Sequence, residues 1–406
     1  MELNKYRISI IGLGYIGLPT ATFLASKGCR VYGYDANPRV IEKLQSGKVH
    51  IVEEGLQKRV NFGIKSGKLT FHNKLQPADI YIICVPTPFT LMKGKKVPDL
   101  SYVIDATENI ANLLKKGDSI ILESTSPVGT SQKIYSTLRK GFKQDFYMAY
   151  CPERVLPGKI FEELESNVKI VGGIDGKSTN RIATFFKKVI SADVVSTDSK
   201  TAELIKLIEN SYRDVNIAFA NEISMLCDDY DIDYFNAIKL ANLHPRVNIL
   251  QPGPGVGGHC IAVDPWFLIS DNHKNTRLIK TGREINTLKE SWVINRIKAK
   301  SKELQTQYKK ELKIGIYGLT FKPNIDDLRE SPALKIAQKI ALLDCEVFAI
   351  EPNITSFKGL KMMNINESID AIDLKVFLVK HKEFCKRSFL KSIQGNQLLD
   401  FCGIFQ

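Results

Sequence analysis

Apolar residues in the first half of the chain gather in short runs that alternate with segments of helical spacing. Residues 7–28 begin as an apolar run, turn at glycines and continue with helical periodicity, and residues 30–35 form a second apolar run. This order of strand, helix and strand is typical of a βαβ unit. Further strand-like runs lie at 79–86, 119–125, 146–152 and 168–173, with helical segments such as 101–116 between them. The pattern predicts a doubly wound α/β domain that ends near residue 195.

The pattern changes at residue 198. Residues 198–230 keep helical spacing throughout, and Asp198 or Ser199 suits the position that caps the start of a helix. A helix of this length is unusual in a globular domain, so we expect a central connector or a subunit interface. Helical spacing returns over 233–241 and 276–308.

The last hundred residues repeat the strand–turn–helix–strand order of the first unit. The repeat covers 312–353 without its glycine pattern, and further strands are expected at 373–381 and 396–404. We therefore predict an α/β fold with two Rossmann-like doubly wound domains, joined by a long central helix and a helical middle domain. The predicted boundaries are 1–197, 198–308 and 309–406.

The first glycine turn carries a candidate cofactor site. Gly12, Gly14 and Gly17 form a GxGxxG pattern between strand and helix, and Asp35 ends the next strand. The glycines allow a pyrophosphate to approach the backbone at a helix N-terminus. Asp35 can accept hydrogen bonds from a ribose diol and would repel a 2′-phosphate, which favours NAD over NADP. The alternative is a glycine turn in another kind of α/β domain.

A second glycine-rich stretch, "PGPGVGGHCIAVDPWF" at 252–267, surrounds a single Cys260. It is too rich in glycine for a helix interior and too rich in proline for a central strand. One interpretation is an ordered loop that presents a reactive thiol. The other is a surface turn around a small buried cysteine.

Composition narrows the class of protein. The chain has 44% hydrophobic and 25% charged residues and a formal net charge of +13. The basic residues are dispersed without a long tract, which argues against a nucleic-acid-binding protein, whereas a phosphate-bearing substrate would account for part of the surplus. The eight cysteines form no CxxC pair and no metal-ligand spacing, so we expect reduced thiols, a cytoplasmic location and no metal. We expect neither a signal peptide nor a membrane span.

Six motifs together resemble those of the nucleotide-sugar 6-dehydrogenases. In chain order they are "GLGYIG", "ESTSPVGT", "CPERVLPG", "ELIKLIENSYRDVNIAFANE", "GGHCIAVDPWF" and "GLTFKPNIDDLRESP". This family includes the UDP-glucose and UDP-N-acetylmannosamine dehydrogenases. The third and fifth motifs most resemble the UDP-N-acetyl-D-mannosamine branch. The resemblance covers nearly the whole chain.

The resemblance implies an NAD-dependent oxidation of a sugar primary alcohol to a carboxylate in two hydride transfers. It implies that Cys260 is the nucleophile, which forms a thiohemiacetal and then a thioester. Lys206 and Asn210 would stabilise oxyanion character at the reacting carbon, with Lys206 as a possible acid or base. Without the resemblance, these two residues would simply be an exposed polar face of a helix.

Asp264, Thr125 and Glu153 complete the catalytic set implied by the resemblance. Asp264 would position water or tune the lysine, or else cap a loop, and Thr125 and Glu153 would act on water and beside NAD. The UDP-glucose branch has a second glutamate where this chain has Pro157. The general base is therefore open, and Glu153 would share that role with water or Lys206.

The resemblance also implies two sets of binding residues. Those expected to bind NAD are Gly12, Gly14, Tyr15, Ile16, Gly17, Asp35, Arg39, Thr87 and Thr125. Those expected to bind substrate are Arg154, Val155, Lys206, Asn210, Arg213, His244, Arg246, Gly257, Phe321, Lys322 and Arg329. Any one of the basic residues could instead form an ordinary surface ion pair.

The favoured function is oxidation of UDP-N-acetyl-D-mannosamine to its uronate as a surface polysaccharide precursor, such as one for a capsule. The same chemistry on UDP-N-acetylglucosamine or UDP-glucose is the alternative. A non-catalytic nucleotide-sugar binder is disfavoured because Cys260, Lys206 and Asn210 are all present. We expect a homodimer that packs through the long helix, with neither nucleic acid nor a membrane as a partner.

Overall fold

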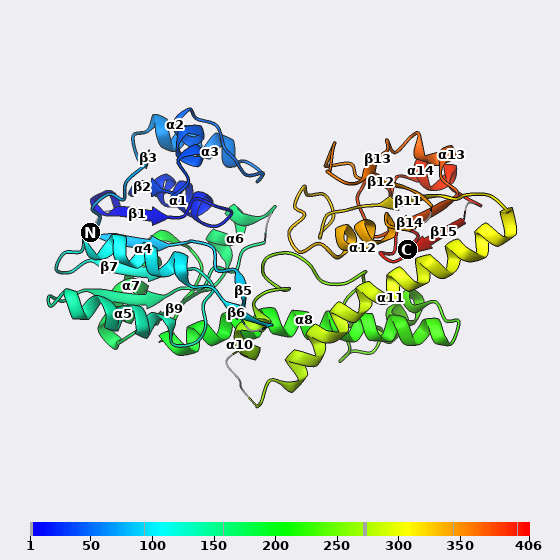
Figure 1. The fold of residues 1–406 in the computed structure, drawn as a ribbon. Helices are drawn as coiled ribbons and strands as arrows, with labels where there is room; N and C mark the ends of the chain where they lie inside the picture. Colours follow the sequence, from blue (N-terminus) through cyan, green and yellow to red (C-terminus); the bar gives the residue numbers. More distant parts are fainter. Residues whose placement is uncertain (1–2, 93, 157, 271–273, 344, 396) are drawn as a thin grey trace. The chain divides into compact units, whose positions relative to one another are not determined.

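A computed structural model describes the chain except for residues 1–2, 93, 157, 271–273, 344 and 396. The chain forms two compact units, Met1–Ile208 and Glu209–Gln406. Figure 1 shows each unit built around its own sheet.

The first unit contains an eight-stranded sheet in the order β10-β9-β8-β7-β4-β1-β2-β3. All neighbouring strands are parallel except β8 and β9, which are antiparallel. The strands are β1 (Arg7–Ile11), β2 (Arg30–Tyr34), β3 (Leu69–His72), β4 (Ile80–Ile83), β7 (Ser119–Leu122), β8 (Tyr147–Tyr150), β9 (Lys169–Gly173) and β10 (Val194–Asp198). A separate antiparallel hairpin joins β5 (Phe89–Met92) to β6 (Lys95–Pro98).

Helices cover both faces of this sheet, as the doubly wound prediction requires. They are α1 (Gly17–Ser26), α2 (Pro38–Gln45), α3 (Leu56–Lys65), α4 (Ser101–Ala111), α5 (Thr130–Gly141), α6 (Ile160–Ser166) and α7 (Gly176–Val189), after a short 3-10 turn at Leu3–Lys5. Successive residues of β4 face opposite cores: Ile82 packs with residues of α1 and α7, and Ile83 packs with residues of α4 and α5.

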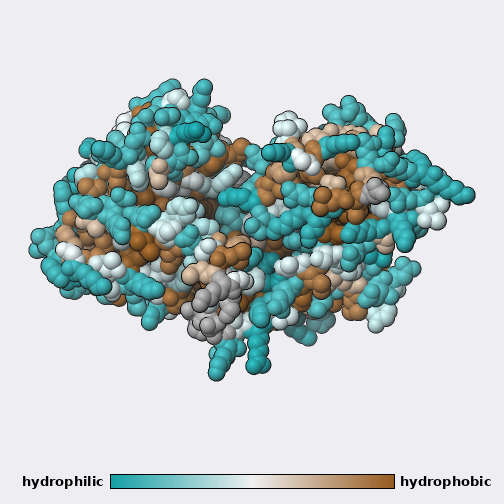
Figure 2. All heavy atoms as spheres, in the orientation of Figure 1, coloured by the Kyte–Doolittle hydropathy of each residue, from teal (hydrophilic) through white to brown (hydrophobic). Residues whose placement is uncertain are grey.

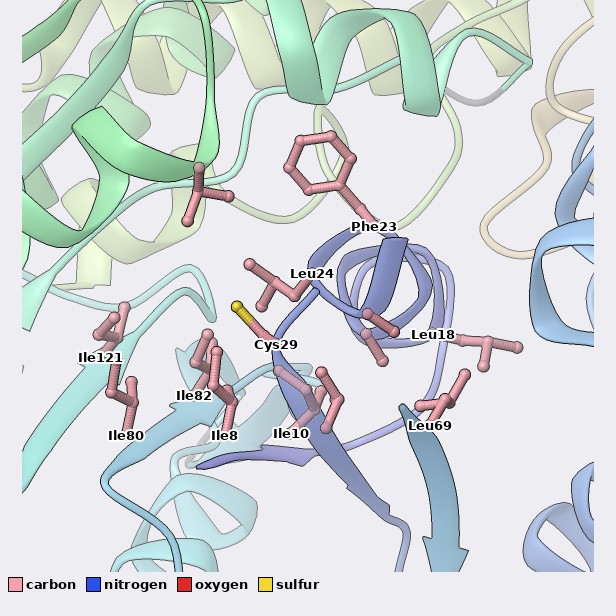
Figure 3. Close-up of a cluster of buried hydrophobic side chains, with 14 of the residues drawn as sticks. Ile8, Ile10, Leu18, Phe23, Leu24, Cys29, Leu69, Ile80, Ile82 and Ile121 are labelled. Carbon is pink, nitrogen blue, oxygen red and sulfur yellow. The ribbon is translucent and has the colours of Figure 1, made fainter. Parts of the chain in front are cut away.

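The core on the α1 side contains one of the free thiols. Figure 3 shows the sulfur of Cys29 among Leu24, Ile8 and Ile82, all of which are buried. Burial raises the pKa of Cys29 to about 11. This cysteine is therefore an inert packing residue.

The predicted long helix is α8 (Ser199–Asp229). Asp198 caps it, since its carboxylate accepts the Thr201 N–H at 3.0 Å. The part of α8 in the second unit is crossed by α11 (Arg277–Tyr308), as Figure 1 shows. Two shorter helices, α9 (Tyr234–Ala241) and α10 (Pro265–Ser270), lie between them in the chain.

The second unit contains a five-stranded parallel sheet in the order β13-β12-β11-β14-β15. Its strands are β11 (Lys313–Tyr317), β12 (Glu346–Ile350), β13 (Lys361–Met362), β14 (Leu374–Phe377) and β15 (Gln397–Asp400). Its helices are α12 (Pro332–Ile340), α13 (Ser368–Ala371) and α14 (Arg387–Ser392). The predicted second Rossmann-like domain is therefore present.

The predicted internal repeat extends to individual hydrogen bonds at the turn after the first strand of each sheet. In the first unit Gly12 has φ of 90°, its N–H donates to Tyr34 O at 2.9 Å, and Leu13 N donates to Asp35 at 2.9 Å. In the second unit the matching positions repeat these features. Gly318 has φ of 93°, its N–H donates to Ile350 O at 2.9 Å, and Leu319 N donates to Glu351 at 2.8 Å.

Figure 2 shows hydrophilic side chains over most of the visible face of each unit, with smaller apolar areas between them. Among the described residues, no helix combines the length and apolar character that crossing a membrane requires.

Candidate active site

Five predicted site residues of the first unit follow five adjacent strands. Gly12 follows β1, Asp35 follows β2, Thr87 lies beyond β4, Thr125 lies beyond β7, and Glu153 lies beyond β8. Because parallel strands end at the same edge of a sheet, the fold brings these residues to one edge. In open α/β sheets this carboxyl edge is where nucleotides bind.

Each of the three glycines in the first turn is required for a different structural reason. A Cβ on Gly12 would lie 2.8 Å from Cys84 O, and one on Gly17 would lie 1.8 Å from Gly12 O. A Cβ on Gly14 would meet no atom within 4 Å. Gly12 and Gly17 thus let strand and helix pack closely, while the open side of Gly14 leaves room for a ligand. The turn fits a pyrophosphate at the start of α1.

Both carboxylate oxygens of Asp35 bind backbone. Asp35 Oδ2 accepts Leu13 N and Oδ1 accepts Asn37 N, each at 2.9 Å. Asp35 therefore ties the glycine turn to the end of β2. A carboxylate oxygen has two lone pairs, so a ribose hydroxyl can still donate to it.

The other predicted cofactor residues surround this turn. Ile16 precedes the first residue of α1, and half-buried Tyr15 packs against the apolar core. Arg39 is exposed in the first turn of α2, and its N–H donates to the Asn37 side chain at 3.1 Å. Thr87 and Thr125 are half-buried.

Glu153 and Lys206 are brought together within the first unit. The Lys206 ammonium on α8 donates to the main-chain oxygen of Glu153 at 2.7 Å. Arg154 N donates to the Glu153 carboxylate at 2.8 Å, and the Arg154 guanidinium donates to Val168 O. Val155 is half-buried beside them, and Pro157 lies outside the described residues.

Glu53, which the sequence did not single out, clamps the backbone at Gly158 and Ile160. The Glu53 carboxylate accepts Gly158 N at 2.8 Å and Ile160 N at 3.1 Å. Ile160 is the first residue of α6, so Glu53 also satisfies a donor at that helix start. The clamp holds Gly158 and the start of α6.

In the second unit Cys260 lies in a turn that leads into α10. Its carbonyl accepts Val263 N at 3.0 Å and Asp264 N at 2.8 Å, and its side chain is half-buried. The turn therefore holds Asp264 close to Cys260. All eight cysteines are free thiols.

The glycines before Cys260 pack against the other predicted substrate loop. A Cβ on Gly257 would lie 2.6 Å from Glu330 O and 2.7 Å from Phe321 Cβ, and Gly258 N donates to Arg329 O at 3.0 Å. Gly258 has φ of 83°, which favours glycine. Close packing against the neighbouring loop therefore favours glycine at both positions. Gly257, Phe321 and Arg329 are thereby brought together.

Asn210 and Asp264 form a buried pair. The Asn210 amide nitrogen donates to the Asp264 carboxylate, and the two residues are 6% and 3% exposed. Asn210 lies one helical turn after Lys206 on α8. The amide nitrogen carries a second hydrogen that can donate elsewhere.

A buried polar network joins α8 and α11 to both ends of the Cys260 loop. Arg283 donates to Asp214 at 2.8 Å and to Ile261 O at 3.3 Å. Asn286 also donates to Asp214, and Asn221 accepts Gly253 N at 2.9 Å. Burial raises the pKa of Asp214 to about 6, although the charge of Arg283 opposes this. No motif in the sequence indicated this network.

Lys322 and Arg329 lie in the loop after β11. The Arg329 guanidinium forms a bidentate pair with Asp327, with Nε 3.0 Å from both carboxylate oxygens. Burial raises the pKa of Asp327, but hydrogen bonds and charge from Arg329 outweigh it and the net pKa is lowered. A diphosphate at Arg329 would have to share or replace this carboxylate.

The remaining predicted substrate residues, Arg213, His244 and Arg246, are exposed in the second unit. His244 Nδ1 accepts Arg246 N at 3.3 Å, which closes a turn after α9. These two residues therefore lie together.

Two charged residues beside Glu153 were also not predicted from the sequence. Lys169 and Glu123 are buried and form ion pairs at the carboxyl edge of the first sheet. The available signal was a single charged residue in each of two otherwise apolar runs, "VKIVGG" and "IILEST".

Comparison with known proteins matches three successive parts of the chain to domains of one family. Residues 6–190 match the NAD-binding domain of the UDP-glucose/GDP-mannose dehydrogenase family, residues 200–288 match its central domain, and residues 315–406 match its UDP-binding domain.

Similar proteins cover nearly the full length. A UDP-N-acetyl-D-mannosamine dehydrogenase of Yersinia pestis is 45% identical over 98% of this chain and 99% of its own length. An NDP-N-acetyl-D-galactosaminuronic acid dehydrogenase of Ralstonia nicotianae is 43% identical over 100% of this chain and 97% of its own. The solved structure of UDP-D-ManNAc dehydrogenase from Pyrococcus horikoshii has a TM-score of 0.90 at 36% identity, covering 98% of this chain and 96% of its own.

Proposed function

This chain belongs to the UDP-glucose/GDP-mannose dehydrogenase family, and we propose that it oxidises UDP-N-acetyl-D-mannosamine to the corresponding uronate with NAD. The observation that carries this proposal is identity of 43 to 46% with enzymes of that name over 93 to 98% of the chain. NAD supplies the hydride acceptor for each of two oxidation steps. The glycine turn after β1 and Asp35 fit its pyrophosphate and adenosine ribose, with Tyr15, Ile16, Arg39, Thr87 and Thr125 as further contacts.

Cys260 is the proposed nucleophile. The first oxidation converts the sugar alcohol to an aldehyde, and the Cys260 thiolate adds to the aldehyde carbon to form a thiohemiacetal. Loss of a second hydride from that carbon leaves a thioester. Water then adds to the thioester, the C–S bond breaks, and the acid and the thiol are released.

Lys206 and Asn210 are proposed to donate to the oxygen of the reacting carbon. Both side chains are donors, so they stabilise negative charge as it develops there. Asp264 accepts from Asn210 and so orients its amide, and Thr125 is proposed to hold water. Glu153 contributes to the site through the main-chain oxygen that binds Lys206.

The nucleotide and sugar are proposed to bind basic and apolar residues. Lys322 and Arg329 suit the diphosphate as a point charge and a planar fork. The further proposed contacts are Arg154, Val155, Arg213, His244, Arg246, Gly257 and Phe321.

The assembly and setting are part of the same proposal. We propose a homodimer that packs through the exposed apolar face of α8, which contains Tyr212, Phe219 and Leu226. Eight free thiols are typical of a reducing compartment, which supports a cytoplasmic location. The uronate product would serve as a precursor of a surface polysaccharide such as a capsule.

An assay of NADH formation with purified UDP-sugars tests the proposal. UDP-N-acetyl-D-mannosamine should give two NADH per sugar and the highest kcat/KM. UDP-N-acetylgalactosamine is the second candidate because of the 43% identical relative. UDP-N-acetylglucosamine and UDP-glucose complete the set. A higher kcat/KM with any of these three would replace the proposed substrate, and no NADH with any would refute the activity.

A further inference from the structure

Three ionisable side chains are buried together at the carboxyl edge of the first sheet. Glu123 directly follows β7, Glu153 lies three residues beyond β8, and Lys169 opens β9. Their exposed fractions are 5%, 9% and 9%. Buried charges are costly unless they are paired, so this cluster needs a structural or functional reason.

Strand direction explains why a lysine reaches this edge. The register between antiparallel β8 and β9 pairs Ala149 with Gly173 and Tyr150 with Gly172. Continued beyond the ladder, this register sets Lys169 opposite Glu153. The reversal of β9 thus brings its first residue to the edge where β8 and, one strand further, β7 end.

The Lys169 ammonium holds both carboxylates. Its Nζ lies 2.9 Å from Glu123 Oε1 and 2.9 Å from Glu153 Oε2. It also lies 4.8 Å from the ring centre of Phe186, a distance at which a cation is attracted to the ring. One ammonium therefore bridges the ends of two neighbouring strands.

The other two carboxylate oxygens are engaged as well. Cys84 Sγ donates to Glu123 Oε2 at 3.3 Å, and Arg154 N donates to Glu153 Oε1 at 2.8 Å. Every oxygen of the two carboxylates thus has a protein partner. The side chain of Glu153 is held toward the interior of the unit by these contacts.

The main chain of Glu153 makes a different contact. Its oxygen accepts the Lys206 ammonium at 2.7 Å. We propose that Lys169 is a positioning residue, which anchors Glu153 through its carboxylate and so aims the Glu153 carbonyl at Lys206. In this arrangement the Glu153 carboxylate is an anchor and does not activate water. The inference rests on the proposed function, in which Lys206 acts at the reacting carbon.

Removing the bridge would disturb the anchor. Burial raises the pKa of Glu123, and the charge of Lys169 opposes this effect. Without Lys169, two neighbouring buried carboxylates would repel each other, and one would take up a proton or move. Either change would release the Glu153 carbonyl from its present direction.

Lys169→Met, Lys169→Arg and a control, Lys375→Met, test the inference. Lys375 is also a fully buried lysine but lies on β14 in the second unit. General acid–base groups contribute about 10²–10⁴-fold to rate, so we expect kcat of Lys169→Met to fall by about 10-fold or more with KM values nearly unchanged. Lys169→Arg should recover much of the loss, because a guanidinium also bridges two carboxylates. Lys375→Met should keep its kcat.

A second readout does not depend on turnover. The rate of Lys206 acetylation at one fixed pH, without substrates, should rise in Lys169→Met and stay near wild type in Lys375→Met. An unchanged Lys206 rate in folded Lys169→Met would overturn the positioning role whatever the sugar assay gives. A raised rate in a protein that oxidises none of the UDP-sugars would keep this role and refute the proposed function.

Two further variants keep the test decisive. If Lys169→Met does not fold, the Glu123→Gln/Lys169→Met double variant removes one charge of each sign, and it should show the same loss of kcat and the same rise in acetylation. Glu153→Gln separates an anchor from a base, because loss of a base for water would leave the Cys260 thioester to accumulate. We expect no thioester by intact mass, and its accumulation would refute the anchor role.

Discussion

A single thiol carries the proposed chemistry, so its removal is the first test at the residue scale. Cys260→Ser should stop uronate formation while NAD binding and the fold persist. A serine hydroxyl is a much weaker nucleophile near neutral pH than a cysteine thiolate. The loss should be several powers of ten, and each tenfold corresponds to about 1.4 kcal/mol of barrier. NADH formation and uronate yield measure it.

Cys385 offers a matched control for that substitution. It is half-buried like Cys260 and lies in the same unit, and burial raises the pKa of its thiol. Cys385→Ser should therefore keep most of the activity. Near-normal uronate yield from Cys260→Ser would show that the proposed covalent step is wrong.

Asp35 governs the expected choice of cofactor. Its carboxylate ends β2 and binds the glycine turn, so a 2′-phosphate would meet a fixed negative charge. Juxtaposed like charges cost several kcal/mol, which predicts a preference for NAD over NADP of ~100-fold or more in kcat/KM. Asp35→Asn should narrow this ratio, because an amide can still accept the Leu13 N–H without repelling phosphate. Equal turnover with both cofactors in the wild type would contradict the prediction.

Lys289 has no role in the proposed chemistry, but its burial should make the stability of the protein depend on pH. It is 2% exposed, donates to Ser224 at 2.7 Å and lies 3.7 Å from the ring centre of Trp292. Burial lowers its pKa from 10.5 to about 7. The unfolded chain therefore binds more protons between these values, so this residue makes stability rise with pH across that window.

Lys289→Met removes the cost of burying this titratable group. It should raise the free energy of unfolding most at pH 7 and below, and the gain should shrink as pH approaches 10.5. Urea unfolding of both proteins at three pH values measures this difference. A gain that grows with pH would contradict the assigned shift.

Residues of the site were predictable from the sequence to different degrees. The glycine turn and Asp35 follow from spacing alone, because their backbone role is local. The roles given to Cys260, Lys206 and Asn210 came from the family resemblance. Lys169 and Glu123 were not predictable, because their pairing depends on which strands become neighbours and on the reversal of β9.

At the scale of elements, the clamp between Glu53 and the start of α6 predicts a local effect. Glu53→Ala removes the acceptor for Gly158 N and Ile160 N, so the segment after Glu153 should loosen. Backbone amides of residues 158–163 should exchange hydrogen faster, and KM for the UDP-sugar should rise more than KM for NAD. Glu54→Ala is the neighbouring control. Unchanged exchange at these amides would show that the clamp does not order the loop.

Most elements were predictable because each has a strong local pattern. The long helix appears as α8 and the last helical segment as α11, and the second sheet appears where the repeat indicated. The hairpin of β5 and β6 was not predicted, since both strands are short and three of the four residues of β5 are exposed. The antiparallel direction of β9 relative to β8 was also not predicted, because strand direction is set by tertiary packing and not by periodicity.

At the scale of the whole molecule, α8 predicts self-association. Tyr212, Phe219 and Leu226 share one face of α8 by their spacing and are 47 to 67% exposed. A run of large apolar side chains of this kind usually marks an interface. Wild-type protein should have a dimer mass by light scattering at micromolar concentration. A monomer mass would contradict the proposed assembly.

A charge on that face should separate the subunits. Phe219→Glu should shift the mass toward the monomer, because a carboxylate would be buried without a partner in the interface. Leu342→Glu is the control, since Leu342 is 86% exposed and follows α12, which is not part of α8. It should keep the wild-type mass.

The repeated turn has a consequence for how inhibitors would act. In the first unit the acid that anchors the turn, Asp35, is only half-buried, whereas its counterpart Glu351 is 7% exposed and pairs with fully buried His381 at 3.1 Å. The Asp35 carboxylate is therefore accessible to a ribose hydroxyl, whereas the Glu351 carboxylate is too buried to bind one. We expect an adenosine diphosphate fragment to compete with NAD and not with the UDP-sugar. Mixed inhibition against both substrates would mean that the two turns are not selective.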